Sequence, residues 1–332
     1  MSLSLEVTLR ERLARLIGEE LRACEAEIGR ELRVSPVPLI REIGEYVALA
    51  GGKRLRPILL LLCARLVGGP PSRAARLGCV VELLHTATLI HDDVVDQAPL
   101  RRGQASANAR WGDDASVLVG DHLYSRCMAL LVADGDLAVM DALAAAMVSM
   151  TEAEVFQLER KRAGALSEGD YLRIIRQKTA TFISACCRVG GLTGGLPGDA
   201  VEAVAAYGEH LGIAFQIIDD SLDFDADEAR LGKAIGADLR EGKRTLPLIA
   251  TLDRATAEER ARIIAALTGA GPGVRDVAEV HRLVKVYDGV GYAAARAATY
   301  VAEAMGRLDR FPLTEEREIL SLIADYVIRR DR

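Results

Sequence analysis

The chain has 332 residues, with 48 acidic and 42 basic side chains and a formal net charge of −6. This negative balance gives no electrostatic support to a nucleic-acid-binding role. The strongest apolar run, PILLLLCA at 57–64, is shorter than the about 20 residues that span a bilayer. The first residues read as a charged amphipathic helix rather than a signal peptide, and the six cysteines show no disulfide or metal spacing. We therefore expect a cytoplasmic protein that has no transmembrane segment and binds no nucleic acid.

Apolar residues recur at three- and four-residue intervals along nearly the whole chain, which predicts helices. Runs of alternating β-branched residues, which would indicate strands, are absent. Turns are predicted where glycine and proline cluster, at 68–71, 195–198 and 269–273. The predicted helices cover 5–32, 36–50, 56–67, 72–96, 114–132, 137–162, 168–193, 199–225, 256–268, 274–286, 288–308 and 314–330.

No linker, repeat or low-complexity segment marks a domain boundary. The helices predicted between 72 and 225 are apolar over most of their circumference, as the central helices of a large bundle are. We therefore expect an all-α protein with a single domain over 1–332, folded as one large helical bundle. Ligand sites in bundles form between facing helices, so the active site is expected in a central cavity.

Two aspartate clusters of the same form, DDVVD and DDSLD, are the main chemical feature of the sequence. Residues four apart share a helix face, so Asp92 and Asp96 form one pair of carboxylates, and Asp219 and Asp223 form another. Like charges this close shift each other's pKa unless a cation lies between them. Hard oxygen ligands in small number suit Mg²⁺, whose coordination substrate phosphates usually complete. The two pairs therefore predict a magnesium-diphosphate site.

The alternative interpretation of each cluster is an acidic patch on a solvated helix face. The segment LLHTATLI precedes the first cluster and IAFQII precedes the second. Both segments are too apolar for an exposed face, and carboxylates embedded in such surroundings need a cation.

Three basic groups accompany the aspartate clusters. The glycine-marked segment GGKRLRP opens an apolar helix, where cations and free backbone N–H groups can hold a phosphate. The segment PLRRG follows the first cluster at a turn, and the Gly-rich, polar segment GKAIGADLREGKRTLP follows the second. Each group alone could be ordinary surface, but a diphosphate bridged by Mg²⁺ still carries charge that needs Arg and Lys donors. The basic residues concerned are Lys53, Arg56, Arg101, Arg102, Lys233 and Lys243.

Together these segments resemble the trans-isoprenyl diphosphate synthase, or polyprenyl synthetase, family. The similarity covers most of the chain, and several separate motifs in the correct order are very specific. Within the family the sequence is similar in particular to the bacterial octaprenyl diphosphate synthases, through ASVLVGDHLYSR, AEVFQLE and the terminal RRDR. The family motifs are GGKRLRP, LHTATLIHDDVVDQAPLRRG, RQKTATF, FQIIDDSLDF and GKAIGADLREGKRTLP.

The resemblance implies a Mg²⁺-dependent homodimer that condenses isopentenyl diphosphate with an allylic diphosphate, farnesyl or shorter. It implies two Mg²⁺ ions at Asp92 and Asp96 and a third at Asp219, with Asp223 nearby. The implied product is a long all-trans polyprenyl diphosphate, the precursor of a quinone side chain, which is handed to a membrane. The implied catalytic residues are Lys178, Thr179 and Gln216; Arg101, Lys178, Lys233 and Lys243 are implied to bind the allylic diphosphate, and Lys53, Arg56, His85 and Arg102 the isopentenyl diphosphate.

Product length is expected to depend on the residues just before the first cluster, where aromatic side chains block the growing tail in this family. Ala87 and Thr88 are small, with Leu84 and Val81 one and two turns deeper, so the sequence favours a long product. The alternative is that Ala87 only allows close helix packing. Candidates for the floor of the channel lie on the helix that contains Leu143, Met147 and Met150.

Other functions remain open at this point. His85 could be a hydrogen-bonded core residue, although the motif favours substrate contact. The whole chain could be a shorter-chain synthase, a class I terpene cyclase or a subunit of a heteromeric synthase. A structural helical protein with incidental acidic patches is a further alternative, which the absence of Mg²⁺-dependent diphosphate binding would favour.

Overall fold

The computed structural model describes residues 2–66, 68–163, 166–225, 239, 242–268 and 273–329. Almost all of these residues are helical, and the strands among them form a single two-stranded hairpin, which confirms the predicted all-α class. The elements are α1 (Ser2–Arg33), α2 (Pro38–Ala48), α3 (Leu55–Arg65), α4 (Pro71–Val95), β1 (Leu100–Arg101), β2 (Gln104–Ala105), α5 (Ala107–Trp111), α6 (Asp113–Asp134), α7 (Leu137–Ala163), α8 (Glu168–Ile175), the π-helix η1 (Arg176–Ala180), α9 (Thr181–Gly194), α10 (Gly198–Asp225), α13 (Leu246–Arg254), α14 (Ala257–Thr268), α15 (Val274–Val286), α16 (Gly289–Leu308) and α17 (Glu315–Arg329).

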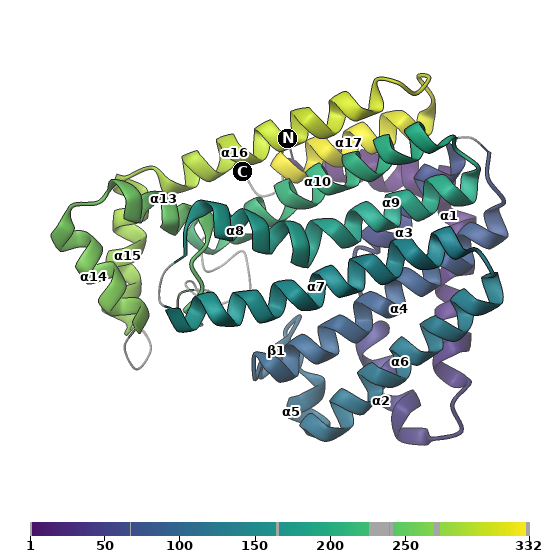
Figure 1. Ribbon diagram of the computed structural model, residues 1–332, viewed down its shortest axis with the longest axis horizontal. Helices are drawn as coiled ribbons and strands as arrows, with labels where there is room; N and C mark the ends of the chain where they lie inside the picture. Colours follow the sequence, from purple (N-terminus) through teal and green to yellow (C-terminus); the bar gives the residue numbers. More distant parts are fainter. Residues whose placement is uncertain are drawn as a thin grey trace.

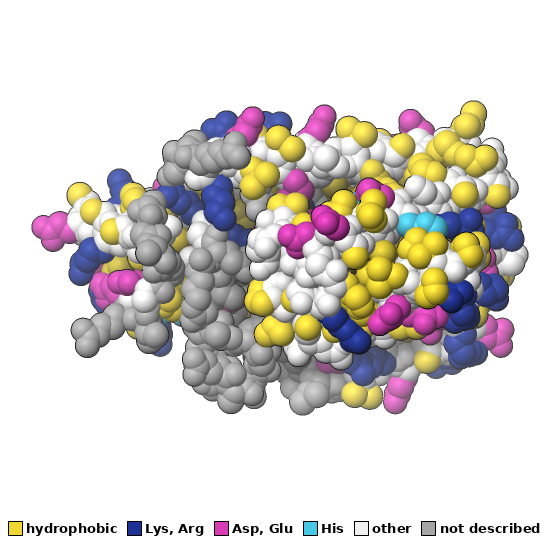
Figure 2. Space-filling view, turned by 90° about the horizontal axis from the view of Figure 1, so that it is seen from below, with side chains coloured by type: hydrophobic (Ala, Val, Ile, Leu, Met, Phe, Trp, Pro, Cys, Tyr) yellow, Lys and Arg dark blue, Asp and Glu magenta, His cyan; other side chains and the backbone are white. Residues whose placement is uncertain are grey.

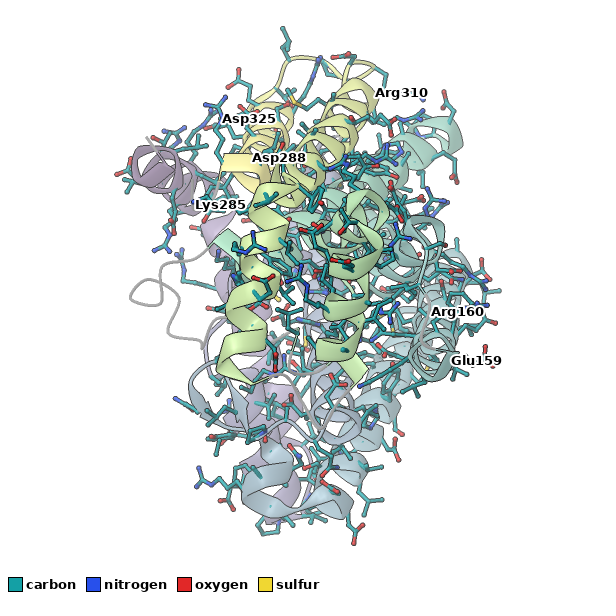
Figure 3. The ribbon with its side chains drawn as sticks, turned by 90° about the vertical axis from the view of Figure 1, so that its left-hand side faces the viewer. Glu159, Arg160, Lys285, Asp288, Arg310 and Asp325 are labelled. Atoms are coloured by element: carbon teal, nitrogen blue, oxygen red, sulfur yellow. The ribbon has the colours of Figure 1, made fainter. Side chains whose placement is uncertain are left out.

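The long helices pack side by side as a bundle (Figure 1). Helix α10 lies between α9 and α16, α9 also contacts α3 and α7, and α4 packs against α1, α3 and α6. One apolar core runs through these helices from Leu9 on α1 to Val327 on α17. A smaller core, which includes Leu248 and Val280, joins α13 to the pair formed by α14 and α15. Figure 3 shows this pair from the side, at the end of the molecule opposite the turn between α16 and α17.

Local sequence signals fix several helix ends. Proline opens α4 at Pro71, where its missing N–H costs nothing. Helix α8 begins with a capping box, in which the Ser167 hydroxyl and the Asp170 carboxylate accept hydrogen bonds from each other's backbone N–H. Gly135 and Gly195 end α6 and α9 in the left-handed conformation, with φ of 76° and 78°. The turn predicted at 195–198 therefore lies where glycine can end a helix.

Two glycines allow helices of the core to approach closely. A Cβ atom on Gly190 of α9 would lie 2.3 Å from the Leu60 carbonyl oxygen of α3. A Cβ atom on Gly212 of α10 would lie 2.6 Å from the Cα atom of Ala180, the last residue of the π-helix. Such distances leave no room for a side chain, so glycine at 212 sets the spacing between α10 and the π-helix.

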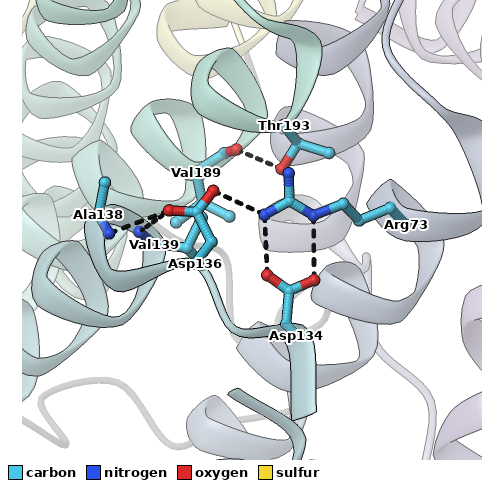
Figure 4. A network of polar contacts seen from close by, with 7 residues as sticks. All are labelled: Arg73, Asp134, Asp136, Ala138, Val139, Val189 and Thr193. Carbon is cyan, nitrogen blue, oxygen red and sulfur yellow. Dashed lines mark hydrogen bonds and ion pairs between the residues drawn. The ribbon is translucent and has the colours of Figure 1, made fainter. Parts of the chain in front are cut away.

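A polar network fastens the start of α4 to the turn between α6 and α7 (Figure 4). The Arg73 guanidinium donates to both carboxylate oxygens of Asp134, at 3.0 and 2.8 Å, and to Asp136 at 2.7 Å. Asp136 also accepts hydrogen bonds from the backbone N–H groups of Ala138 and Val139, which begin α7. The Arg73 hydrogen bond holds the pKa of Asp136 below its ordinary value. This anchor lies at the end of α4 opposite the first aspartate cluster.

The structure differs from the sequence prediction in three stretches of the chain. The helix predicted over 168–193 is divided by a π-helix at Arg176–Ala180. Residues 246–254, which the periodicity left without an element, form α13, whose first turn contains proline. The hairpin of β1 and β2 and the short α5 were not predicted, because segments this short carry no periodic signal. Of the turn predicted at 269–273, only Gly273 is among the described residues.

Candidate active site

The first aspartate cluster lies at the C-terminal end of α4. Asp92 is partly buried in the last turn, and the exposed Asp96 caps the helix and donates its N–H to the Asp92 carbonyl oxygen at 2.8 Å. Burial raises the pKa of Asp92 from 3.8 to about 6, and repulsion from Glu154 and Asp96 adds to the rise. Lys178 opposes this rise. Hard carboxylate oxygens held under such repulsion fit a divalent cation such as Mg²⁺.

Asp93, the middle carboxylate of this cluster, has a different partner. It is 2% exposed and accepts a hydrogen bond from Arg101 Nε at 2.8 Å. Arg101 reaches it because β1 and β2 form a hairpin whose two turn residues, Arg102 and Gly103, both have positive φ, 53° and 78°. Two-residue turns of this handedness match the twist of the paired strands. The predicted turn is thus a hairpin that brings Arg101 back to the aspartate cluster.

The same hairpin meets the glycine-marked segment from the start of α3. A Cβ atom on Gly52 would lie 3.3 Å from Arg102 Nη1, so the Arg102 guanidinium covers this glycine. The neighbouring Lys53 is exposed, with its Nζ 5.6 Å from the centre of the Tyr326 ring. Two basic groups that are separated in the sequence therefore form one cationic surface.

Arg56 and His85 lie beside this surface. The Arg56 guanidinium stacks over the Phe182 ring at 5.2 Å. Arg56 Nε and His85 Nδ1 are buried and have no hydrogen-bond partner among the described residues. Burial, together with the charges of Arg56 and Arg102, lowers the pKa of His85 well below its ordinary value, so the ring is neutral. Buried polar atoms that are left unpaired within a cluster of cations fit an anionic ligand.

The π-helix connects the first aspartate cluster with α10. Lys178 Nζ lies 2.5 Å from Glu154 Oε1 on α7, and its charge acts on Asp92. The next residue, Thr179, donates its hydroxyl to Gln216 Oε1 on α10 at 3.0 Å. A π-helix inserts an extra residue into the turn, so adjacent side chains here can serve two different neighbours.

The second aspartate cluster occupies the last turns of α10, where Asp219 is exposed and Asp223 is partly buried. Asp220, between them, accepts hydrogen bonds from Gln216 Nε2 at 2.8 Å and from the Tyr171 hydroxyl at 2.7 Å. The sequence analysis did not assign Asp220 or Tyr171, although the four-residue spacing from Gln216 to Asp220 was a usable signal. Within the described ranges, no three acidic, histidine or cysteine groups form a ready metal cluster.

The remaining predicted residues are distributed as follows. Lys243 is partly buried just before α13, and Lys233 lies outside the described residues. Val81, Leu84 and Ala87 are fully buried in the main core, while Thr88 is partly buried and donates its hydroxyl to the His85 carbonyl oxygen at 2.8 Å. Leu143 and Met147 belong to the same core, and Met150 packs against it.

Comparison with known proteins assigns the chain to a family. The model of the polyprenyl synthetase family matches residues 37–285. The chain belongs to the polyprenyl synthetase family. The octaprenyl diphosphate synthase of Escherichia coli is 36% identical over 322 residues, 97% of this chain and 99% of the relative. The short chain isoprenyl diphosphate synthase of Methanothermobacter thermautotrophicus is 37% identical over 302 residues, 90% of this chain and 92% of the relative.

A solved structure gives the same result. The crystal structure of polyprenyl synthase from Caulobacter crescentus, complexed with calcium and isoprenyl diphosphate, matches with a TM-score of 0.92 and 36% identity, over 97% of this chain and 98% of that one. The family resemblance that the motifs indicated is confirmed, and this polyprenyl synthetase is a prenyltransferase. None of its described helices is both long and apolar enough to cross a bilayer.

Proposed function

We propose that the protein condenses isopentenyl diphosphate with an allylic diphosphate, farnesyl diphosphate or a shorter primer, to form a long all-trans polyprenyl diphosphate. The observation that supports the proposal is that charged side chains gather in two places around α4. Arg101 and Lys178 lie beside the first aspartate cluster, and Arg102 covers Gly52 next to Lys53, with the buried Arg56 and His85 beside them. A condensation of two diphosphates needs two such sites.

The first site is suited to the allylic diphosphate and Mg²⁺. Asp92, Asp96 and Asp219, with Asp223 nearby, would hold three Mg²⁺ ions, and when bound these ions supply Lewis-acid stabilisation of the departing diphosphate. Arg101, Lys178, Lys233 and Lys243 would donate to the same diphosphate. The raised pKa of Asp92 supports this assignment, because a buried carboxylate among like charges binds a cation favourably.

The second site would hold isopentenyl diphosphate. Lys53 and Arg102 present charge at its edge, and Arg56 and His85 supply the buried polar atoms that have no partner among the described residues. Fixing both substrates converts a bimolecular encounter into an oriented reaction. Because the cationic surface draws on α3, α4 and the hairpin of β1 and β2, the position of this diphosphate depends on all three.

The reaction follows from this arrangement. The C1–O bond of the allylic substrate breaks, its electron pair leaves with the diphosphate, and the oxygens of Thr179 and Gln216 stabilise the allylic cation. The double bond of isopentenyl diphosphate then forms the new C–C bond, and a proton leaves to the released diphosphate. The apolar core below Ala87 excludes water that would capture the cation.

We assign a long product, of octaprenyl length, as the precursor of a quinone side chain that passes to a membrane. The small side chains of Ala87 and Thr88 support this length. Sequence identity alone does not decide it, since the octaprenyl and short chain relatives are 36% and 37% identical.

The test is mass spectrometry of the products that the purified chain forms from isopentenyl diphosphate and farnesyl diphosphate with Mg²⁺. We expect octaprenyl diphosphate from the wild type and a product of geranylgeranyl length from Ala87→Tyr, because a bulky side chain fills the channel without touching the diphosphates. Ala87→Ser is the size-matched control and should keep the long product.

Other outcomes would indicate the alternatives. Release of wild-type product lengths by Ala87→Tyr would make Ala87 a packing residue. A hydrocarbon formed from the allylic diphosphate alone would indicate a terpene cyclase. Complete inactivity of the purified chain, together with retained diphosphate binding, would indicate a subunit of a heteromeric synthase.

A further inference from the structure

Three hydrogen bonds form a continuous chain across α8, the π-helix and α10. The Tyr171 hydroxyl donates to one oxygen of Asp220 at 2.7 Å, and Gln216 Nε2 donates to the other oxygen at 2.8 Å. Gln216 Oε1 in turn accepts from the Thr179 hydroxyl at 3.0 Å. This series of hydrogen bonds therefore ends at Thr179 and Gln216, the two residues whose oxygens would stabilise the allylic cation.

Asp220 sets the donor and acceptor roles in this series of hydrogen bonds. The Gln216 amide turns its NH₂ group toward Asp220 and its carbonyl oxygen toward Thr179, because a carboxylate oxygen accepts a hydrogen bond from an amide N–H. The Thr179 hydrogen is then used on Gln216 Oε1, and the hydroxyl lone pairs remain for another neighbour. Without Asp220, rotation of the amide by half a turn would present the positive NH₂ end instead.

Tyr171 gives this carboxylate a fixed position. Its side chain is 3% exposed and belongs to the main core, so the hydroxyl cannot move far from its place on α8. The capping box of Ser167 and Asp170 holds the start of the same helix. On α10, Gly212 sets the distance to the π-helix one turn before Gln216. Packing on both sides thus holds Asp220 and its two donors in register.

We propose that Tyr171 and Asp220 are positioning residues for the condensation, and that Asp220 acts through Gln216 and Thr179 rather than as a metal ligand. The proposal rests on the function proposed above. Helix geometry turns Asp220 by about 100° from Asp219, so consecutive carboxylates of one cluster serve different partners. Asp219 remains on the exposed side for Mg²⁺, and Asp220 keeps the negative ends of two dipoles toward the reacting carbon.

The test compares Tyr171→Phe, Asp220→Asn and Asp220→Leu with Asp219→Asn. In Tyr171→Phe we expect kcat to fall about tenfold, with both KM values and the Mg²⁺ concentration for half-maximal rate changed by less than about twofold. Asp220→Leu should lower kcat by about a hundredfold. Asp220→Asn should recover most of this loss, because its amide can still accept from Gln216 and bond Tyr171.

A matched control removes an equivalent tyrosine hydrogen bond. The Tyr292 hydroxyl donates to Glu168 on α8 at 2.7 Å, outside the Gln216 network, so Tyr292→Phe should leave kcat unchanged. Unaltered kcat in Tyr171→Phe, which is too mild a change to unfold the chain, would overturn the proposal. A Mg²⁺ requirement raised as strongly in Asp220→Asn as in Asp219→Asn would also overturn it, because Asp220 would then be a ligand.

Calorimetry of inorganic diphosphate binding with Mg²⁺ separates this proposal from the proposed function without any turnover. Asp219→Asn should weaken that binding, and Asp220→Asn should leave it within about twofold of the wild type. Equal weakening in the two variants contradicts the positioning role alone. If the wild type neither binds diphosphate with Mg²⁺ nor condenses the substrates, the proposed function itself fails.

Discussion

Adjacent residues of the first aspartate cluster have different electrostatic environments, because successive positions on α4 point in different directions. Burial raises the pKa of Asp92, while Asp93 is buried against Arg101 and accepts its hydrogen bond. Lys178 and Glu154 form a close pair beside Asp92. The site therefore contains two kinds of carboxylate: Asp92, which a metal cation would bind, and Asp93 and Glu154, which orient the side chains of Arg101 and Lys178.

Asp92→Asn should stabilise the metal-free protein. The folded chain raises the pKa of Asp92 from 3.8 to about 6, so ionisation of this group opposes folding fully above pH 6 and not at all below pH 3.8. With a chelator at pH 7.5, the substitution should raise the free energy of unfolding by at most about 3 kcal/mol. The gain should shrink as the pH falls from 7.5 to 5, as urea titrations would measure.

The neighbouring carboxylate of Asp96 provides a control for the Asp92→Asn prediction. Asp96→Asn, at an exposed position, should change the stability much less. In the wild type, Mg²⁺ affinity should weaken as the pH falls through 6, because protonation of Asp92 competes with the metal. Equal stability of Asp92→Asn and wild type at pH 7.5 would contradict the assigned burial of charge.

Lys53→Ala and Lys178→Ala should affect different substrates. Loss of a charged hydrogen bond costs about 1.5–3 kcal/mol, which is at least a tenfold effect. Lys53→Ala should therefore raise KM chiefly for isopentenyl diphosphate, and Lys178→Ala should act on the allylic substrate, as initial rates with one substrate varied would measure. Lys285→Ala, on α15 in Figure 3, is the control that should change neither. Identical effects of both variants on both substrates would remove the division into two sites.

Spacing within a helix predicted Asp92, Asp96, Asp219 and Asp223 as metal ligands, because a helix maps spacing onto direction, and this assignment stays a prediction. Spacing did not identify the bond between Asp93 and Arg101, since that bond depends on a hairpin turn with two positive φ values. Tyr171 was missed for a similar reason. Its hydroxyl meets Asp220 on another helix, 49 positions further along the chain, and a periodic pattern does not predict such a contact.

At the scale of elements, Arg54 joins three helices below the cationic surface. Although it lies between Lys53 and Arg56 in the sequence, Arg54 Nη1 donates to Glu82 of α4 at 2.7 Å and Nη2 donates to the carbonyl oxygen of Ala48, the last residue of α2, at 2.9 Å. Arg54 also precedes α3 in the left-handed conformation, with φ of 47°. The paired side chains are only 10% and 6% exposed, so this ion pair is nearly buried.

Breaking this pair should cost both stability and isopentenyl diphosphate binding. Arg54→Ala removes the ion-pair partner of the buried Glu82 carboxylate, which typically costs about 3–5 kcal/mol. Glu82→Ala should cost less, because Arg54 Nε still lies 3.6 Å from Glu25 Oε1. The double variant Arg54→Met, Glu82→Leu should regain most of the stability in urea titrations while KM for isopentenyl diphosphate stays raised, because the start of α3 is no longer tied to α2. Arg10→Ala, which breaks an exposed pair with Glu6, should change stability by less than about 0.5 kcal/mol.

If the double variant recovered both stability and isopentenyl diphosphate binding, any well-packed pair at these two positions would suffice.

The π-helix at Arg176–Ala180 was not predicted from the sequence. Helical periodicity predicted the extent of 168–193 correctly, but one extra residue within a turn does not alter the apolar pattern on either side of it. Gly212 leaves room for α10 to lie against Ala180, the last residue of the π-helix.

At the scale of the whole molecule, one apolar core extends from α1 to α17, which supports our proposal of a single domain. The fold class was predictable because burial on a helix repeats along the chain. Product length was not, since Val81, Leu84 and Ala87 are fully buried, and burial fits both a packed core and a channel wall. The oligomeric state is a property for which the structure adds evidence, because part of its surface is apolar and exposed, as a subunit interface would be.

Two neighbouring helices carry apolar side chains toward solvent. On α6, Leu118, Met128 and Val132 are 67%, 38% and 68% exposed, and on α7, Val148 and Val155 are 60% and 54% exposed. Spacings of seven, or of multiples of seven, place residues 118 and 132, and likewise 148 and 155, on one face. Figure 2 shows apolar side chains gathered on the right-hand half of the underside, where α2 and α6 lie in Figure 1. Exposed stripes of this length are typical of subunit interfaces.

We propose that a second copy of the chain covers these stripes in a homodimer, in which the same faces of α6 and α7 meet about a twofold axis. The wild type should sediment at twice 35.7 kDa at micromolar concentration. Leu118→Glu combined with Val148→Glu should shift it to the single-chain mass, because two buried carboxylates on each subunit would face apolar surface. Leu313→Glu, at a position that is 81% exposed between α16 and α17, is the control that should leave the mass unchanged. A wild type that sediments only as a single chain would leave the stripes of α6 and α7 without this partner.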